Sequence, residues 1–348
     1  MTELLGGKYE VLELAGEGGM AKVYRGQTHG AAGFTRPVAI KRVLAPLSHN
    51  PEFLKMFVEE ARVVSELDHP NIAQIHDFDR DRSGEYYLVL EWVEGLTLAE
   101  WRQGYGTHGN HTPWTLTAAI GIEVLEALHA AHVREDADGR PAPIFHRDVT
   151  PQNVMVSSCG VVKLTDFGLA RAMDRSSITK PGFVKGKLSY LAPELTYEAE
   201  PSAQTDVFSA GVVLWEVLAG EKLFKGKDPL KVVGTIRDMD VPDLADFRDD
   251  LPEQLRQIIC KALQRNPIER YASSREMARD LAALLRATNE VTDSYVIAQS
   301  VRWAQAQLKQ TRPSEPATKP FAAQQALTNA ASAEETIPDT NIPLTRRK

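Results

Sequence analysis

Three glycines near the start of the chain have the spacing of a phosphate-binding turn. Gly16, Gly18 and Gly19 lie within LAGEGGMAKVY, between two short runs typical of β-strands. Because glycine has no side chain, backbone N–H groups in such a turn can approach phosphate oxygens closely. A glycine-rich turn between strands is also typical of an ordinary β-hairpin, so both interpretations remain open on this pattern alone.

A lysine and a glutamate downstream predict an ion pair beside that turn. Lys41 ends the β-type run VAIK, and Glu60 falls on the apolar face of the helical stretch NPEFLKMFVEEARVVSEL, whereas Glu59 falls outside it. Asn50 and Pro51 are typical of the cap and first residue of such a helix. A carboxylate on a buried face needs a cation, so we predict a Lys41–Glu60 pair. The alternative is a shifted helix boundary that leaves both glutamates in solvent.

These stretches belong to a longer series of motifs that resembles a known family. The motifs, over roughly residues 8–286, are GEGGMAKVY, VAIK, EEA, HPNI, HRDVTPQN, TDFGLAR, SYLAPE, TDVFSAG and ERY. One such motif arises easily by chance, but the whole series in this order is specific. The sequence resembles the Hanks-type (eukaryotic-like) Ser/Thr protein kinases of bacteria. The resemblance implies an α+β bilobal protein-kinase fold, with a small antiparallel β-sheet lobe containing one helix and a larger, mainly helical lobe.

The resemblance implies a role for each matching residue of the site. Asp148 would accept the proton of the substrate hydroxyl, and Asn153 and Asp166 would hold Mg²⁺, with Mn²⁺ as an alternative ion. Lys41, paired with Glu60, would bind the α- and β-phosphates of ATP. The implied nucleotide site consists of Gly16, Gly18, Gly19, Val23, Ala39, Lys41, the gatekeeper Leu90, and the backbone of Glu91 and Val93.

Four further matches imply supporting roles. Asp206 would brace the catalytic loop, and Glu194 and Arg270 would form a buried ion pair. Arg147 would bind a phosphorylated residue of the activation segment, the alternative being that it meets only backbone in a permanently ordered loop. The candidate phosphorylation sites are Ser176, Ser177 and Thr179, of which we favour Thr179.

The catalytic loop departs from the family at one position. Ser/Thr kinases carry a lysine two residues after the catalytic aspartate, where this chain has Thr150, and a threonine in the facing segment, where it has Lys187. We predict an exchange, in which the flexible stem of Lys187 returns the charge from the opposite wall and Thr150 supplies the hydroxyl. The alternative is two independent substitutions, with Lys187 in solvent. The missing lysine also weakens the distinction from tyrosine kinases, although the rest of the loop does not resemble theirs.

The elements that must position these residues follow from hydrophobic periodicity. A small lobe, about residues 8–93, is predicted from β-type runs at 9–14, 22–27, 37–43, 73–78 and 86–93, with one long helix between the third and fourth. A larger lobe, about residues 94–286, is predicted from helical patterns at 117–132, 204–220, 251–265 and 274–287. Residues 1–7 are predicted to be an N-terminal extension.

Beyond the larger lobe we predict one further amphipathic helix and a tail. Residues 287–310 place an apolar stripe on one face, with Thr292 or Asp293 as cap; the stripe consists of Ile297, Val301, Ala304 and Leu308. The tail, residues 311–348, has the composition of a disordered segment. It is either an inert extension or a carrier of phosphothreonine sites for phosphothreonine-binding proteins, the candidates being Thr336, Thr340 and Thr345.

Composition narrows the class of partners. With 43% hydrophobic residues, 25% charged residues and a formal net charge of −7, the chain is typical of a globular protein that binds neither nucleic acid nor membrane. Cys159 and Cys260 lie too far apart to suggest a zinc site, and a reducing cytoplasmic location is expected. His129 and His132 are predicted to be packing residues rather than metal ligands.

The predicted function is transfer of a phosphoryl group to protein substrates and to the chain itself by autophosphorylation. The alternative is a pseudokinase or signalling scaffold that binds nucleotide without efficient transfer; only Thr150 favours it, because the other catalytic positions match. A small-molecule kinase of related fold is disfavoured by the APE motif and the segment before it, which in protein kinases seat a peptide.

Overall fold

The computed structural model describes residues 4–18, 21–48, 50–167, 187–226, 228–238 and 240–311, apart from the side chains of Ala45, Pro46 and Lys187. The chain divides into two units, Met1–Leu308 and Lys309–Lys348. Several predicted features lie outside the described residues: Gly19, the candidate phosphosites Ser176, Ser177 and Thr179, and the tail 312–348 with Thr336, Thr340 and Thr345.

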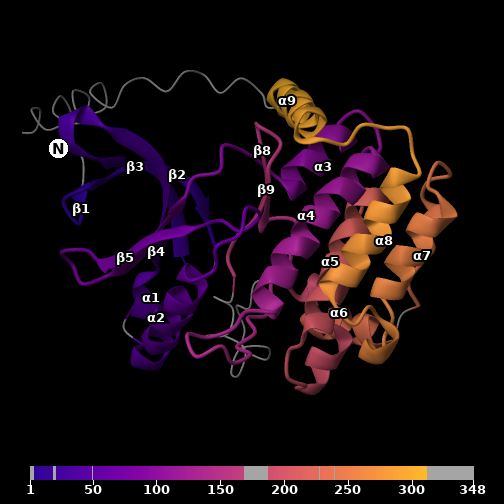
Figure 1. Ribbon diagram of the computed structural model, residues 1–348, viewed down its shortest axis with the longest axis horizontal. Helices are drawn as coiled ribbons and strands as arrows, with labels where there is room; N and C mark the ends of the chain where they lie inside the picture. The colour runs from indigo at the N-terminus through magenta and orange to yellow at the C-terminus, as the bar shows by residue number, and fades with distance from the viewer. Residues whose placement is uncertain are drawn as a thin grey trace, which may run out of the picture. The chain divides into compact units, whose positions relative to one another are not determined.

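The small lobe is built on one antiparallel sheet in the order β1-β2-β3-β4-β6-β5 (Figure 1). Its strands are β1 Leu4–Leu5, β2 Tyr9–Glu17, β3 Ala21–His29, β4 Thr35–Val43, β5 Ile75–Arg80 and β6 Tyr86–Glu91. Val23 pairs with Lys41, and Ala39 pairs with Leu90. Because side chains alternate along a strand, Ala39 and Lys41 lie on the same face of β4. The register therefore gathers four predicted nucleotide-site residues on neighbouring strands.

One long helix, α2 (Pro51–Ser65), follows the four-residue helix α1 (Ala45–Ser48). The Asn50 side chain accepts hydrogen bonds from the backbone N–H groups of Glu52 and Phe53, which fixes the start of α2. Glu60 is half-buried whereas Glu59 is exposed, in agreement with the helical periodicity. Phe53, Phe57 and Ala61 pack against the sheet in one hydrophobic cluster, and Val64 belongs to the core of the larger lobe.

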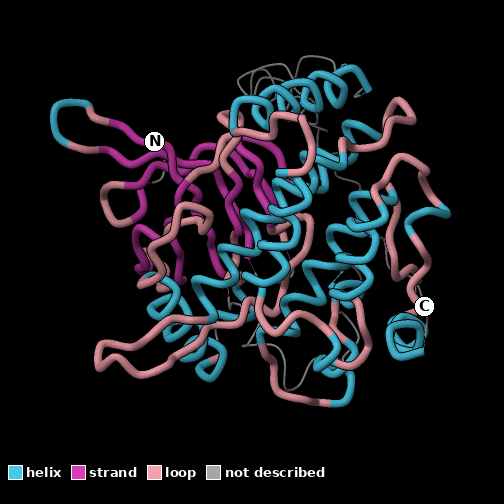
Figure 2. Tube along the Cα trace, turned by 45° about the vertical axis from the view of Figure 1, so that its right-hand side comes forward, coloured by secondary structure: helices cyan, strands magenta, loops and turns pink. Residues whose placement is uncertain are grey.

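The larger lobe is mainly helical (Figure 2). Its helices are α3 Leu98–Gly106, α4 Trp114–His132, α5 Ala203–Ala219, α6 Pro229–Asp238, α7 Glu253–Ala262, α8 Ser274–Arg286 and α9 Ser294–Thr311. A small sheet, β7 Gly95–Thr97, β8 Val154–Ser157 and β9 Val162–Leu164, joins strands in that order. Short 3₁₀ turns include η3 Lys187–Tyr190 and η4 Pro193–Tyr197.

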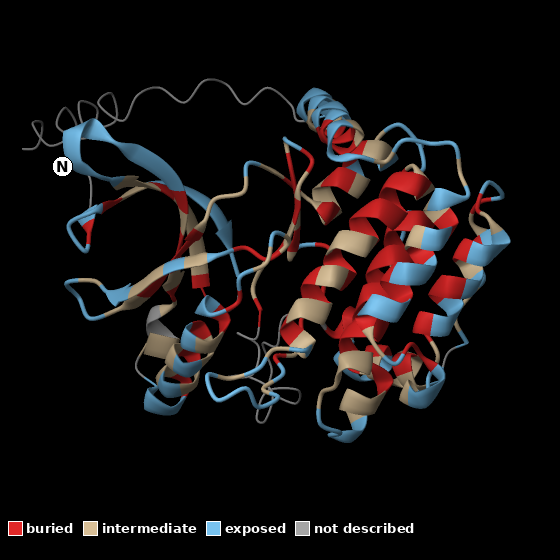
Figure 3. Ribbon diagram, viewed as in Figure 1, coloured by how far each residue is buried: buried red, intermediate tan, exposed pale blue. Residues whose placement is uncertain are grey.

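The core of the larger lobe surrounds α4 and α5, where buried residues concentrate in Figure 3. Every residue of α5 from Thr205 to Ala219 is buried, including the ionisable Asp206 and Glu216. A helix enclosed on all sides is a rigid support, and each buried carboxylate on it must find donors. No helix within the described ranges is both long and apolar enough to cross a membrane.

The elements that differ from the sequence-based expectations include β1, α3 and α6. Leu4 and Leu5, expected to precede the domain, pair with β2 as the edge strand β1. Helix α3 was not predicted, and its last turn occupies residues that resemble a surface turn because Gly104 and Gly106 fall there. Helix α6 was not predicted either. Both helices are short, so their apolar spacing covers too few turns to show a period.

Candidate active site

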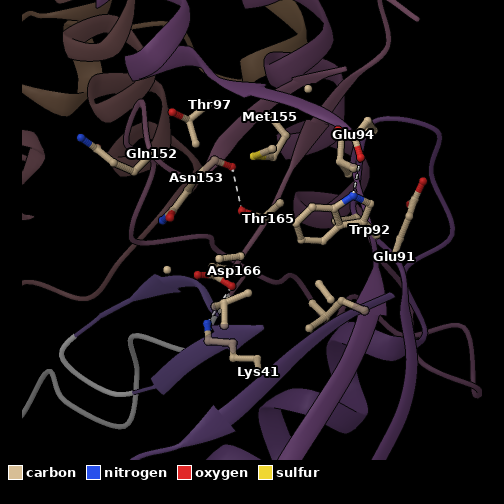
Figure 4. A pocket seen from close by; sticks show the side chains of 18 of the residues that line it. Lys41, Glu91, Trp92, Glu94, Thr97, Gln152, Asn153, Met155, Thr165 and Asp166 are labelled. Carbon is tan, nitrogen blue, oxygen red and sulfur yellow. Dashed lines mark hydrogen bonds and ion pairs between the residues drawn. The ribbon is translucent and has the colours of Figure 1, made fainter. Parts of the chain in front are cut away.

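A cavity of about 380 Å³ opens between the small sheet and the larger lobe (Figure 4). Of the residues predicted for the nucleotide site, Gly16, Val23, Ala39, Lys41, Leu90, Glu91 and Val93 line it. Gly18 does not; its N–H donates to the Ala21 carbonyl at 2.9 Å, closing the hairpin turn. The opposite wall is formed by Gln152, Asn153, Met155, Thr165 and Asp166. The cavity therefore joins the strand residues to the catalytic loop.

The catalytic loop holds an aspartate against an amide. The Asp148 side chain is largely buried, and Asn153 Nδ2 donates to its carbonyl oxygen at 2.7 Å and to its Oδ2 at 3.0 Å. With both amide hydrogens directed at Asp148, the oxygen available on Asn153 is Oδ1. Thr150 is buried, and its carbonyl accepts from the Asn153 N–H at 3.0 Å. The loop thus fixes one carboxylate and presents one amide oxygen.

The lysine of the cavity pairs with a carboxylate other than the predicted one. Lys41 Nζ lies 2.7 Å from Asp166 Oδ1, and both side chains face the cavity in Figure 4. The Lys41–Glu60 ion pair stays a prediction. Periodicity identifies the face of α2 on which Glu60 lies, but not the distance from that face to Lys41. Asp166 reaches the lysine from a segment 125 residues away.

A buried aspartate on α5 supports the loop from below. Asp206 accepts hydrogen bonds from the backbone N–H groups of His146, at 2.8 Å, and Arg147, at 2.9 Å. His132 Nε2 lies 2.8 Å from the same carboxylate. Burial opposes ionisation of Asp206, but the hydrogen bond and charge of His132, together with the Arg147 N–H, outweigh it and lower the pKa of Asp206. His132, predicted only to pack, is therefore a polar partner of this support.

Two residues near the site, Arg147 and Asp166, have an unusual backbone conformation that neighbouring groups must stabilise. Arg147 has φ of 64° and Asp166 has φ of 61°, in the left-handed region that non-glycine residues seldom adopt. Such residues cost of order 1–3 kcal/mol each and persist where neighbours hold them. Asp206 holds the first through the Arg147 N–H. The His146 ring, whose pKa is lowered by burial, bonds the Thr165 carbonyl at 2.9 Å, immediately before the second.

A lysine on β9 supports the rim of the cavity where β6 ends. Lys163 Nζ lies 2.9 Å from Glu91 Oε2, and the Glu91 N–H donates to the Gln74 carbonyl at 2.9 Å. Glu91 is thereby held through both its side chain and its backbone N–H. Sequence reasoning missed Lys163; the available signal was a lysine between two buried apolar residues of a short strand.

A largely buried bidentate ion pair links η4 to the residue that follows η6 (Pro267–Glu269) in the larger lobe. Arg270 Nη1 and Nη2 donate to the two Glu194 oxygens at 2.8 and 2.7 Å. The remaining guanidinium hydrogens go to the carbonyls of Gln264, Gln204 and Arg265. Both side chains are largely buried, so each charge depends on the other.

Replacing Arg270 with leucine is expected to lower the free energy of unfolding by about 3–5 kcal/mol, because Glu194 remains as an uncompensated buried charge. Urea unfolding followed by far-UV circular dichroism measures the change. Lys225→Ala is the matched control, because its pair with Glu221 is solvent-exposed and is expected to contribute at most about 1 kcal/mol. Equal shifts in the two variants would contradict the expectation.

The segment that contains Lys187 is described only in part. Lys187 begins η3, and its side chain is not among the described atoms. Farther along η3, the Tyr190 hydroxyl donates to Glu216 Oε2 at 2.6 Å, and Arg102 Nη2 lies 3.1 Å from Glu216 Oε1. Burial, then the neighbouring Glu216 charge, raises the pKa of Tyr190. Tyr190 is thus hydrogen-bonded to Glu216 of α5, which in turn pairs with Arg102 of α3.

Comparisons with known proteins agree with this geometry. The family model described as protein kinase domain matches residues 9–281. The chain is 35% identical over 279 residues to the tyrosine-protein kinase MasK of Myxococcus xanthus, covering 80% of this chain and 43% of that protein. It is 36% identical over 284 residues to the serine/threonine-protein kinase PknL of Mycobacterium tuberculosis, covering 81% of this chain and 67% of that protein.

A third relative and a solved structure extend the comparison. The serine/threonine-protein kinase PrkC of Bacillus subtilis is 32% identical over 279 residues, 80% of this chain and 40% of that protein. The crystal structure of the Mycobacterium tuberculosis PknI kinase domain matches with a TM-score of 0.60 and 26% identity, covering 81% of this chain and 98% of that chain. The chain therefore spans about two fifths of the length of MasK and PrkC.

Proposed function

The chain belongs to the Hanks-type protein kinase family of bacteria, and from this premise we propose that it transfers the γ-phosphoryl group of ATP to hydroxyl groups of protein side chains. One observation carries the proposal. Asp148, held by Asn153, lies on the same loop that lines the cavity containing the Lys41–Asp166 pair. The proposed proton acceptor thus lies next to Asn153, and the proposed phosphate-binding cation and metal ligands line the cavity itself.

The residues present fit a magnesium ion and ATP. Magnesium prefers oxygen ligands and usually binds through one or two protein groups plus substrate phosphates. Asn153 Oδ1 and the Asp166 carboxylate would hold it, and the bound ion would neutralise negative charge on the phosphates. Within the described ranges no group of three or more His, Cys, Asp or Glu residues gathers as a metal site. The apolar surfaces of Val23, Ala39 and Met155 would enclose the adenine ring.

In the proposed mechanism the chain supplies position and charge. Asp148 accepts the proton of the substrate hydroxyl as the oxygen attacks the γ-phosphorus, the bond from that phosphorus to the β–γ bridging oxygen breaks, and ADP leaves. The Asn153 amide keeps the Asp148 carboxylate aimed at that hydroxyl. Lys41 balances the charge of the ATP phosphates. Asp206 holds the backbone of His146 and Arg147, the two residues directly before Asp148.

The exchange of Thr150 and Lys187 remains part of the proposal. Thr150 is buried beside Asp148, where a lysine of the usual family pattern would reach the γ-phosphate. Lys187 begins η3, and lysine carries its ammonium group on a flexible four-carbon stem. We propose that Lys187 supplies the charge that the catalytic loop lacks.

The proposed acceptors are serine and threonine hydroxyls, including those of the chain itself. The names of PknL and PrkC support this class, whereas the name of MasK supports tyrosine. Phosphorylation of Thr179, Ser177 or Ser176 would place new charge in the activation segment, where Arg147 is the proposed partner. Proteins that bind phosphothreonine in the tail are a further proposed partner class.

The test is transfer of labelled phosphate from Mg-ATP by the purified full chain, followed by phosphoamino acid analysis. Label on serine and threonine is expected, with label on an added basic protein substrate as well. Label confined to tyrosine would replace the Ser/Thr assignment with that of a tyrosine kinase. A folded chain that binds ATP but transfers nothing would favour the scaffold function.

A further inference from the structure

Helix α9 lies outside the residues that match the family model and packs against α3 (Figure 1). Trp101 Nε1 donates to Ser300 Oγ at 3.0 Å, and both residues are buried. Gly104 approaches so closely that a Cβ at that position would lie 2.7 Å from the Ala304 Cβ. The inner face of α9, formed by Ile297, Ala298, Ser300, Val301 and Ala304, is fully covered. Helices α3 and α9 are thus closely packed between Trp101 and Ser300 and between Gly104 and Ala304.

Helix α3 depends on this contact for its position. It has nine residues, and a helix of that length is only marginally stable without tertiary packing. Gly104 and Gly106 lower its intrinsic stability further. Trp101 has none of its surface exposed and contributes a large apolar side chain to the interface. Displacing α9 would therefore change where α3 lies.

The first turn of α3 forms part of the cavity. Thr97 and Glu100 both line it, and they make a capping box in which Glu100 Oε2 accepts from the Thr97 N–H and Oγ1, each at 2.9 Å. These two side chains move with the helix because the box ties them to its N-terminus. One residue after Glu100 comes Trp101, which contacts α9. The contact with α9 and the residues that line the cavity thus lie within one turn of α3.

The same helix also contacts, through Glu216, the segment that contains Tyr190. Arg102 Nη2 lies 3.1 Å from Glu216 Oε1, and the second oxygen of Glu216 accepts from the Tyr190 hydroxyl at 2.6 Å. Arg102 follows Trp101 directly, so its guanidinium is placed by the same packing. Glu216 is nearly inaccessible to solvent and is held from two sides.

We infer that α9 is a positioning element of the nucleotide cavity, acting through α3 on Thr97 and Glu100 and, by way of Arg102, on the Tyr190 segment. The inference rests on the proposed function for the identity of the ligand. By linkage, if docked α9 favours nucleotide binding, then bound nucleotide must hold α9 more firmly in place. This reciprocity gives a test in the unaltered protein.

The first measurement is amide hydrogen exchange of the full chain with and without saturating Mg-ADP. Slower exchange over Ser294–Leu308 is expected on binding, because openings of α9 become rarer. A chain that binds Mg-ADP while α9 exchanges at an unchanged rate overturns this inference alone. A chain that binds no nucleotide overturns the proposed function and this inference together.

Substitutions in the full chain provide the second measurement. Ser300→Ala removes the acceptor of the Trp101 N–H, and Ala304→Leu widens the closest approach of the helices. Both are expected to raise the Kd for Mg-ADP and the KM for ATP by about 5-fold or more while changing kcat less, the lower end of typical coupling between sites. Ser300→Thr, which retains a hydroxyl, is expected to restore most of the affinity.

The matched control is Gln299→Ala on the exposed face of α9, with an expected change in Kd of no more than about 2-fold. Thermal unfolding of each variant identifies losses of the folded state. Folded Ser300→Ala and Ala304→Leu variants that bind Mg-ADP as tightly as the Gln299→Ala control overturn the inference.

Discussion

Replacing Asp148 with asparagine is expected to reduce phosphoryl transfer by about 10²- to 10⁴-fold, the range that a positioned general base contributes. The substitution preserves the shape of the side chain but removes the carboxylate that accepts the substrate proton. Asp148 is not among the residues that line the nucleotide cavity, so affinity for ATP is expected to change little. The measurements are turnover with labelled ATP and nucleotide Kd by calorimetry.

The matched control for Asp148 is Asp249→Asn, an exposed aspartate that changes the net charge by the same amount. It is expected to retain wild-type turnover. An Asp148→Asn chain that keeps turnover within about 10-fold of the wild type, below the contribution of a general base, would show that proton acceptance by this residue is not limiting. Equal losses in the two variants would indicate a charge effect instead.

Lys187→Met is expected to lower kcat by about 10²- to 10³-fold, as for the loss of one preorganised charge at a transition state. Because Thr150 occupies the position of the usual catalytic-loop lysine, Lys187 is the proposed source of that positive charge. A double variant, Thr150→Lys with Lys187→Thr, restores the usual arrangement of the family and is expected to recover much of the lost turnover. Single-turnover phosphoryl transfer measures both effects.

The swap distinguishes the two explanations for Lys187. If Lys187 replaces the missing lysine, the effects of Thr150→Lys and Lys187→Met on turnover are not additive in a double-mutant cycle. The reason is that both substitutions change the same positive charge beside the γ-phosphate. Lys225→Met, at an exposed lysine, is the control and is expected to be neutral. Near-normal turnover in Lys187→Met would assign that side chain to solvent and leave Thr150 as an independent substitution.

Local patterns in the sequence predicted much of what is local in the structure. Asn50 caps α2 as expected, and periodicity correctly separated Glu60 from Glu59. The same spacing argument predicted the buried stripe of α9, and the Asp293 side chain accepts from the Val296 N–H at 3.0 Å, as a cap does. These features depend on residues within one or two helical turns, so the order of residue types determines them.

Features that depend on distant partners could not be predicted in this way. The lysine of the cavity meets Asp166, 125 residues farther along the chain, and local spacing carries no information on such a contact. His132 bonds Asp206 across 74 residues, a contact that no spacing rule reveals. Periodicity likewise showed that α9 has a face to bury, but not that Trp101 would cover it.

The division of α2 between two hydrophobic clusters determines how the small lobe can move. Phe53 and Phe57 travel with the sheet, whereas Val64 is embedded in the larger lobe. A rotation of the small lobe would therefore pivot α2 about its C-terminal end. Along the helix axis, Glu60 lies about 6 Å from Val64 and Phe53 about 16 Å, at a rise of 1.5 Å per residue. Opening of the lobes would therefore sweep the aromatic end through an arc nearly three times as long as that of the carboxylate.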